Sequence, residues 1–130
     1  MLFTGTHHVA LCTPHFVALR QFYTETLELP VVGGFPNRNI IFLDTGNTTI
    51  ELIERTAPLV AAQQGWAHFA FEVADIEATH AELVGRGIVF HVAPKLFPEE
   101  NPAVKITFFK DPDGNELELV ERLAPGYPQP

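Results

Sequence analysis

The sequence is poor in cysteine, in basic residues and in long apolar runs, and each shortage excludes a class of protein. Its one cysteine, Cys12, cannot form an internal disulfide, which is typical of a reducing compartment. Eight basic residues against 16 acidic ones give a formal net charge of −8, so no nucleic-acid or anionic-membrane partner is expected. No apolar run approaches the roughly 18 residues of a membrane-spanning helix.

The N-terminal residues also lack the pattern of a signal peptide, because Arg20 is the first basic residue and no apolar segment precedes it. A cytoplasmic location is therefore expected. The composition, 46% hydrophobic and 18% charged, is that of a globular protein, and 130 residues suit one domain with a real core. We predict a single domain over residues 1–124 and a loose tail over 125–130.

Hydrophobic periodicity predicts a strand, a helix and three more strands in the first half of the chain. The helix is expected to have Thr13 as its N-cap and Pro14 as its first residue, and to run to about Leu27. The strands are expected at residues 5–12, 29–33, 39–43 and 48–54.

After a linker over residues 55–65, the same order of elements returns. A strand over 66–73 precedes a helix that Asp75 caps and that stops at Gly87. A Pro-rich loop over 94–102 and a turn over 111–114 separate the remaining strands, which are expected at 88–92, 104–110 and 116–121.

The two halves therefore form an internal βαβββ repeat, which predicts an α+β fold with module 1 at about 5–54 and module 2 at about 66–123. His8 and His68 fall in the first strand of each module. Glu51 and Glu118 fall in the last strand of each. The repeat places a histidine at equivalent positions of the two modules and a glutamate at another pair of equivalent positions. This match is the strongest functional signal in the chain.

Side chains alternate between the two faces of a strand, so each of these four strands has one mainly apolar face. We expect the helices to cover the apolar face, which carries Val9, Leu11, Ile50, Leu52, Phe69, Phe71, Leu117 and Leu119. The opposite face is free to line a cavity, and it carries His8, Glu51, His68 and Glu118.

Two imidazoles and two carboxylates suit one divalent ion, Zn, Ni, Co, Mn or Fe, better than calcium or copper. We therefore predict that His8, Glu51, His68 and Glu118 bind one such ion. Four protein ligands leave an octahedral ion two open positions, which a substrate with two adjacent oxygens would fill. A carboxylate at such a site is placed to move a proton on a carbon next to a carbonyl.

Other residues compete for these roles. His7 is the rival of His8, but it shares a face with Val9 and Leu11, and the repeat also favours His8. Structural or solvated roles are expected for His15, His80, His91, Glu54, Glu116 and Glu121. Cys12 and Trp66 either line the site or pack in the core. Candidate cations for an anionic substrate, with solvated surface charge as the alternative, are Arg38, Lys95 and Lys105.

With these residues in place, the chain resembles the vicinal-oxygen-chelate superfamily, which includes glyoxalase I, methylmalonyl-CoA epimerase, extradiol dioxygenases, fosfomycin-resistance transferases and bleomycin-binding proteins. The resemblance covers nearly all of residues 5–123. It lies in HHVAL with FYTETLEL, TIELIE, GWAHFAFEV and FFKDPDGNELELVE. It implies two βαβββ modules whose mixed β-sheets form a partly closed cup with the helices outside. The family's metal-binding positions fall on the same four residues.

The His-Glu-His-Glu set is most similar to that of glyoxalase I. The resemblance thus implies a metal-dependent lyase or isomerase in which Glu118, or else Glu51, transfers the proton. The substrate would be a small molecule such as a glutathione or CoA thioester. An acyl-CoA epimerase, a ferrous extradiol dioxygenase and a non-catalytic drug-binding protein remain alternatives. Relatives are often homodimers, with each site inside one chain or with one His/Glu pair from each.

Overall fold

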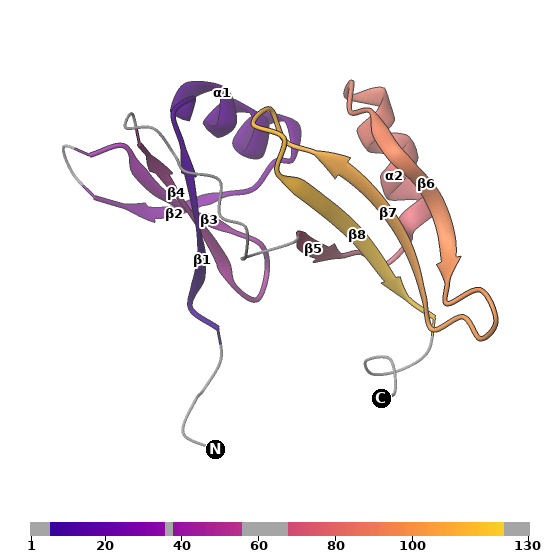
Figure 1. Cartoon of the computed structure of the whole chain (residues 1–130). Coiled ribbons are helices and arrows are strands. Elements are labelled where there is room, and N and C mark those ends of the chain that lie inside the picture. Colours follow the sequence, from indigo (N-terminus) through magenta and orange to yellow (C-terminus); the bar gives the residue numbers. More distant parts are fainter. Residues whose placement is uncertain (1–5, 36–37, 56–67, 124–130) are drawn as a thin grey trace, which may run out of the picture. The chain divides into compact units, whose positions relative to one another are not determined.

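The computed structural model describes residues 6–35, 38–55 and 68–123. The chain divides into two units, Met1–Gln63 and Gln64–Pro130, which correspond to modules 1 and 2. Each described module has one mixed four-stranded sheet with helical structure on one face (Figure 1). The predicted α+β class and the βαβββ order of both modules are confirmed.

In module 1 the strands lie in the order β1-β4-β3-β2, and the first and last strands run parallel. Alternate residues of β4, Ile50 and Leu52, are buried beneath the helix, with Leu19, Tyr23 and Leu43 completing the core. The elements are β1 (His8–Thr13), α1 (Phe16–Gln21), the π-helical segment η1 (Phe22–Thr26), β2 (Val31–Gly34), β3 (Ile40–Asp44) and β4 (Thr49–Glu54).

The first helix begins two residues later than the sequence predicted. Thr13 is fully buried as the last residue of β1, where it pairs with Glu54 in the parallel ladder. Its hydroxyl oxygen accepts a hydrogen bond from the backbone N–H of His15 at 2.8 Å, so Pro14 lies in a turn before the helix. The prediction of Thr13 as N-cap was wrong because strand pairing holds this residue in the sheet.

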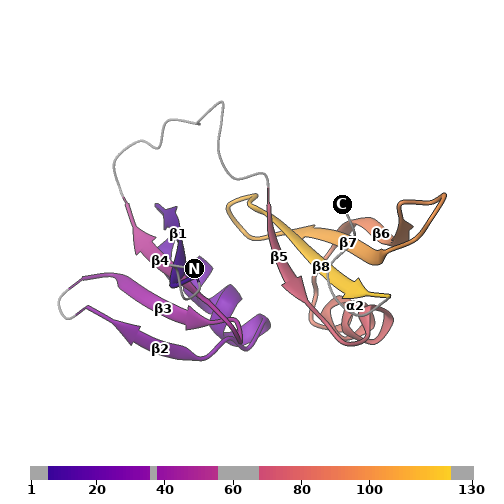
Figure 2. The same cartoon turned by 90° about the horizontal axis from the view of Figure 1, so that it is seen from below.

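Module 2 repeats the arrangement with the strand order β5-β8-β7-β6, again with parallel first and last strands. Figure 2 shows α2 against one face of this sheet. The elements are β5 (Phe69–Glu72), α2 (Ile76–Gly85), β6 (Phe90–Phe97), β7 (Val104–Lys110) and β8 (Glu116–Arg122).

Both predicted ends of α2 are confirmed. The side chain of Asp75 accepts a hydrogen bond from the N–H of Ala78 at 3.0 Å. At the other end Gly87 has φ +92°, a left-handed conformation that glycine adopts without steric cost. The N–H groups of Gly87 and Ile88 bond back into the last turn, which completes a Schellman motif.

Strand β6 extends five residues beyond its predicted end into the segment that the sequence marked as a Pro-rich loop. Pro94 lies inside this strand. The strand tolerates it because β6 is at the edge of the sheet and its register with β7 shifts between Val92 and Lys95. The prediction of a loop from 94 was wrong for this reason.

Several predictions fall on residues outside the described ranges, namely most of the linker, Trp66 and the tail over 125–130. The single-domain boundary at 124 likewise stays a prediction. None of the helices in the described ranges is long and apolar enough to cross a membrane.

The turn between β7 and β8 is built on the buried side chain of Asp111. Its Oδ1 accepts the backbone N–H groups of Asp113 and Asn115, both at 2.9 Å, and its Oδ2 accepts the amide of Asn115 at 2.7 Å. Gly114 follows with φ +84°. The predicted turn is confirmed, and it defines where β8 begins.

We expect Asp111→Ala to lower the free energy of unfolding by about 2–4 kcal/mol, because it leaves buried hydrogen-bond donors without an acceptor. Urea unfolding followed by circular dichroism measures this change. The control is Glu82→Ala, which removes an exposed ion pair with Arg86 on α2 and should cost less than about 0.5 kcal/mol. Equal losses in the two variants would contradict the role of Asp111.

Candidate metal centre

In module 1 the parallel register of β1 and β4 brings His8 and Glu51 together. Ala10 lies opposite Glu51 in the ladder. His8 is two residues before Ala10, so its side chain is on the same face of the sheet as that of Glu51. The distance from His8 Nε2 to Glu51 Oε1 is 3.7 Å. The imidazole is 37% exposed and the glutamate side chain only 15%. The pair therefore presents a partly accessible nitrogen beside a largely buried carboxylate.

Module 2 builds the same pair in the same register, although β5 begins at Phe69, so the prediction that His68 lies within this strand was wrong by one residue. Ala70 lies opposite Glu118, and His68 Nε2 is 3.6 Å from Glu118 Oε1. The imidazole is 41% exposed and the glutamate side chain 11%. The repeat seen in the sequence is thus also a repeat of side-chain geometry, to within 0.1 Å in the nitrogen-to-oxygen distance.

A phenylalanine completes each pair, and sequence reasoning missed both. Phe42 on β3 lies opposite Glu51, and its ring centroid is 5.6 Å from that of His8 at an interplanar angle of 81°. Phe108 on β7 lies opposite Glu118 and contacts the ring of His68 at 5.7 Å and 86°. The repeat contained a signal for them, because each phenylalanine lies in the third strand of its module and the two are therefore equivalent in the repeat.

We define half-site 1 as His8, Phe42 and Glu51, and half-site 2 as His68, Phe108 and Glu118. His8, and not its rival His7, contacts Glu51. His7 lies next to His8, with 2.8 Å between their Nδ1 atoms, so one of the two rings donates a hydrogen bond to the other.

Burial raises the pKa of the Glu118 carboxyl above its usual value, because the charged form loses solvation. The neighbouring His68 acts in the opposite direction through its charge, but less strongly. Glu118 is also the more buried of the two site glutamates. In the metal-free protein this carboxylate is therefore held in an unfavourable setting, which a bound cation would relieve.

The donors of each half-site fit a divalent ion of the zinc or nickel type. Two atoms that bind one ion at about 2.1 Å are roughly 3.0–3.4 Å apart, a few tenths of an ångström shorter than the separations observed here. Within each module, the described residues bring together two such donors and no group of three or more. The four-ligand set therefore needs a half-site from each module and stays a prediction.

The remaining histidines and acids have structural roles, some of them unexpected. His80 packs against the ring of Phe90 at 4.3 Å, as a structural residue would. Glu121, expected to be solvated, instead accepts the backbone N–H of Ile76 at 2.8 Å and caps α2. Glu116 is about one third exposed, and His91 Nε2 lies 3.0 Å from its Oε2.

The structure places one candidate substrate cation, Lys105, away from its half-site. Lys105 forms an ion pair with Glu77 of α2, and this contact raises its pKa. Lys105 is thus held on the helix side of the sheet. Arg38 and Lys95 are exposed on the surface of their modules.

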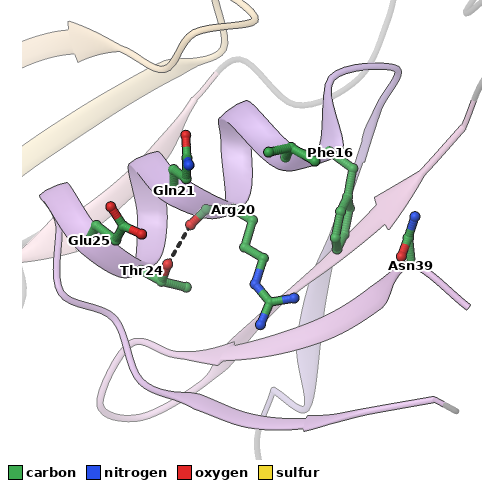
Figure 3. Close-up of a pocket in the computed structure, with 7 residues that line it drawn as sticks. Phe16, Arg20, Gln21, Thr24, Glu25 and Asn39 are labelled. Carbon is green, nitrogen blue, oxygen red and sulfur yellow. Dashed lines mark hydrogen bonds between the residues drawn. The ribbon is translucent and has the colours of Figure 1, made fainter.

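Module 1 also has an open cavity of about 380 Å³ on the side of α1 and η1, away from half-site 1. Figure 3 shows the side chain of Arg20 extending from the helix toward the sheet, with the Thr24 hydroxyl donating to the Arg20 carbonyl at 2.6 Å. The cavity is lined by Phe16, Val17, Arg20, Gln21, Thr24, Glu25 and Asn39. It contains none of the predicted ligands.

With this geometry established, comparison with known families gives a clear match. The model of the Glyoxalase/Bleomycin resistance protein/Dioxygenase superfamily matches residues 5–119. The chain belongs to this superfamily. The resemblance to the vicinal-oxygen-chelate group is thereby confirmed.

Similar proteins and solved structures match this chain at low identity. Uncharacterized protein YraH of Bacillus subtilis strain 168 is 26% identical over 79% of this chain and 87% of its own length. The crystal structure of the glyoxalase family protein from Enterococcus faecalis is 31% identical with a TM-score of 0.76, over 93% of this chain and 100% of the other. Lactoylglutathione lyase from Agrobacterium tumefaciens, 19% identical with a TM-score of 0.72 over 93% and 96%, shows the fold alone.

In protein freed of metal by a chelator, we expect Glu118→Gln to raise the melting temperature at pH 7 by about 1–3 °C. Folding raises the pKa of Glu118, so ionisation of this group lowers the stability of the folded state. The loss begins as the pH rises through the pKa of the unfolded chain and is complete above the pKa of the folded protein. The gain should therefore disappear below about pH 4. Circular dichroism melts from about pH 3 to pH 8 measure this difference.

The matched control is the exposed Glu82→Gln, which should stay within about 1 °C of the wild type at every pH. A Glu118→Gln variant that melts below the wild type at pH 7 would contradict the unfavourable setting of this carboxylate.

Proposed function

We propose that this chain is a divalent-metal-dependent lyase or isomerase of the glyoxalase I type, acting on a substrate with two adjacent oxygens. The observation that carries the proposal is the pair of matching half-sites, in which His8 with Glu51 and His68 with Glu118 have the same register and nearly the same separation. One unmatched His/Glu contact would be ordinary, but two in equivalent strands of a repeat favour a shared ligand.

The proposed ion is held by His8, Glu51, His68 and Glu118, one half-site from each module. The borderline-hard nitrogen and oxygen donors suit Zn, Ni, Co, Mn or Fe. When bound, such an ion supplies positive charge that draws electron density from the two substrate oxygens and makes the adjacent C–H bond more acidic.

Glu118 is the proposed proton carrier, with Glu51 as the alternative. Glu118 is the more buried carboxylate, and its raised pKa makes it a stronger base than the carboxylate of an ordinary glutamate. In this role its carboxylate accepts a proton from the carbon next to the substrate carbonyl and returns it to the neighbouring carbon. The proton carrier thus lies within the module that ends in the DPDGNELELVE segment.

The substrate class follows from the same chemistry. A hemithioacetal of glutathione, or an acyl-CoA thioester, offers a carbonyl or hydroxyl oxygen beside a carbon with a removable proton. A cytoplasmic homodimer is part of the proposal, in which the two half-sites of one centre come from one chain or from two.

We expect the purified protein to bind one equivalent of Zn²⁺ or Ni²⁺ per chain, and His8→Ala or His68→Ala to weaken the affinity by more than about 100-fold. The control is His80→Ala, because His80 also packs against a phenylalanine but has no carboxylate of a half-site beside it. Elemental analysis and competition with a chromophoric chelator measure binding. If both half-site variants bind as tightly as the control, the four-residue centre is wrong.

We expect protein loaded with Ni²⁺, Co²⁺ or Zn²⁺ to convert the hemithioacetal of methylglyoxal and glutathione, and Glu118→Gln to lower kcat by about 100-fold or more. The loss of absorbance of the hemithioacetal measures the rate, and metal content is measured in the same samples. Deuterium exchange into methylmalonyl-CoA without hemithioacetal turnover would indicate an epimerase instead. Oxygen uptake with a catechol and ferrous iron would indicate a dioxygenase, and absence of metal a binding protein.

A further inference from the structure

Phe42 and Phe108 hold the same place in the two half-sites. Each lies directly across the ladder from the site glutamate, on the strand at the far side from the histidine. Each nevertheless contacts that histidine, at 5.6 Å and 5.7 Å and nearly at a right angle. In each half-site the phenylalanine ring and the imidazole ring are therefore in contact, and the strand that carries the glutamate lies between their two strands.

Core packing does not account for these two phenylalanines. Both are only partly buried, on the face of the sheet away from the helix, whereas the next residue in β7, Phe109, is fully buried on the helix side. Half-buried aromatic rings that face a His/Glu pair in both modules point to a role at the site.

The imidazole of His68 needs such a contact most, because the imidazole of His8 already has a hydrogen bond with His7 at 2.8 Å. Both are more than one third exposed, and a side chain in that setting keeps rotational freedom that metal binding must remove. A metal-binding histidine usually donates its second ring N–H to a carboxylate or carbonyl, which fixes the ring. In the described part of the chain, His68 has no such hydrogen bond, and its contacts are Glu118 and Phe108.

We propose that Phe42 and Phe108 are matched positioning residues, which hold the imidazoles of His8 and His68 in the orientation that binds the ion. This inference rests on the proposed metal function. A perpendicular aromatic pair is favourable, so it selects one ring orientation over others.

The same rings exclude water from the carboxylates. Glu51 and Glu118 lie between a phenylalanine on one neighbouring strand and a histidine on the other, and their side chains are only 15% and 11% exposed. Phe108 lies directly across the ladder from Glu118 and so contributes to the low exposure of that carboxylate. One residue thus acts on both donors of its half-site.

The test measures the dissociation constant of Co²⁺ by chelator competition, and the visible absorption spectrum of the Co²⁺ complex, in the full-length protein. Phe108→Leu and Phe42→Leu keep an apolar side chain but remove the ring. We expect each to weaken Co²⁺ binding by about 5–10-fold and to change the absorption bands. Phe108→Tyr and Phe42→Tyr, which keep the ring, should stay within about 3-fold of the wild type.

The matched control is Phe71→Leu, which removes a ring from the helix-facing side of β5 in module 2. It should lower the melting temperature of the metal-free protein without changing the dissociation constant. The melting temperature of each variant separates loss of fold from loss of positioning.

Wild-type protein that binds no Co²⁺ overturns the proposed function, and the positioning role with it. Wild-type protein that binds Co²⁺ while both leucine variants bind equally well overturns the positioning role alone. Leucine variants that are weakened no more than Phe71→Leu, or tyrosine variants weakened as much as the leucines, also overturn it.

Discussion

The parallel pairing of the first and last strands in each module is the constraint on which the site depends. In both modules an alanine lies opposite the glutamate, and this register brings the histidine two residues earlier within 3.7 Å of the carboxylate. A slip of one residue would turn Glu51 or Glu118 toward the helix and bury a charge in the core. The buried residues that alternate with them, such as Leu52 and Leu119, therefore secure the site as well as the core.

Half-site 2 is electrostatically costly in the metal-free chain. Its carboxylate has little exposure to water, and the pKa of Glu118 is raised as a result. Such a setting weakens the fold slightly and strengthens affinity for a cation, because a bound ion removes the cost of burying the charge. The two half-sites are alike in geometry but not identical in burial. That difference is what separates the proposed roles of Glu51 and Glu118.

Acidic residues of module 2 serve two purposes, and burial alone does not distinguish them. Asp111 is buried, yet three hydrogen bonds satisfy its carboxylate and it forms the turn before β8. Glu121, three residues beyond Glu118 and on the opposite face, caps α2. Glu118 has a similar exposure, but its nearest partner is an exposed imidazole at 3.6 Å. The carboxylate that is paired with an exposed imidazole is therefore the one that faces the site.

The sequence by itself determined the repeat, the strand faces and the four candidate ligands, because alternation along a strand and the pairing of equivalent elements are local properties. It did not determine Phe42 and Phe108 as site residues, the cap from Glu121, or the burial of Thr13 in β1. Each of these depends on which strands become neighbours and in what register, and no local pattern contains that information. Only the tertiary structure decided that the histidine, the phenylalanine and the glutamate of each module meet.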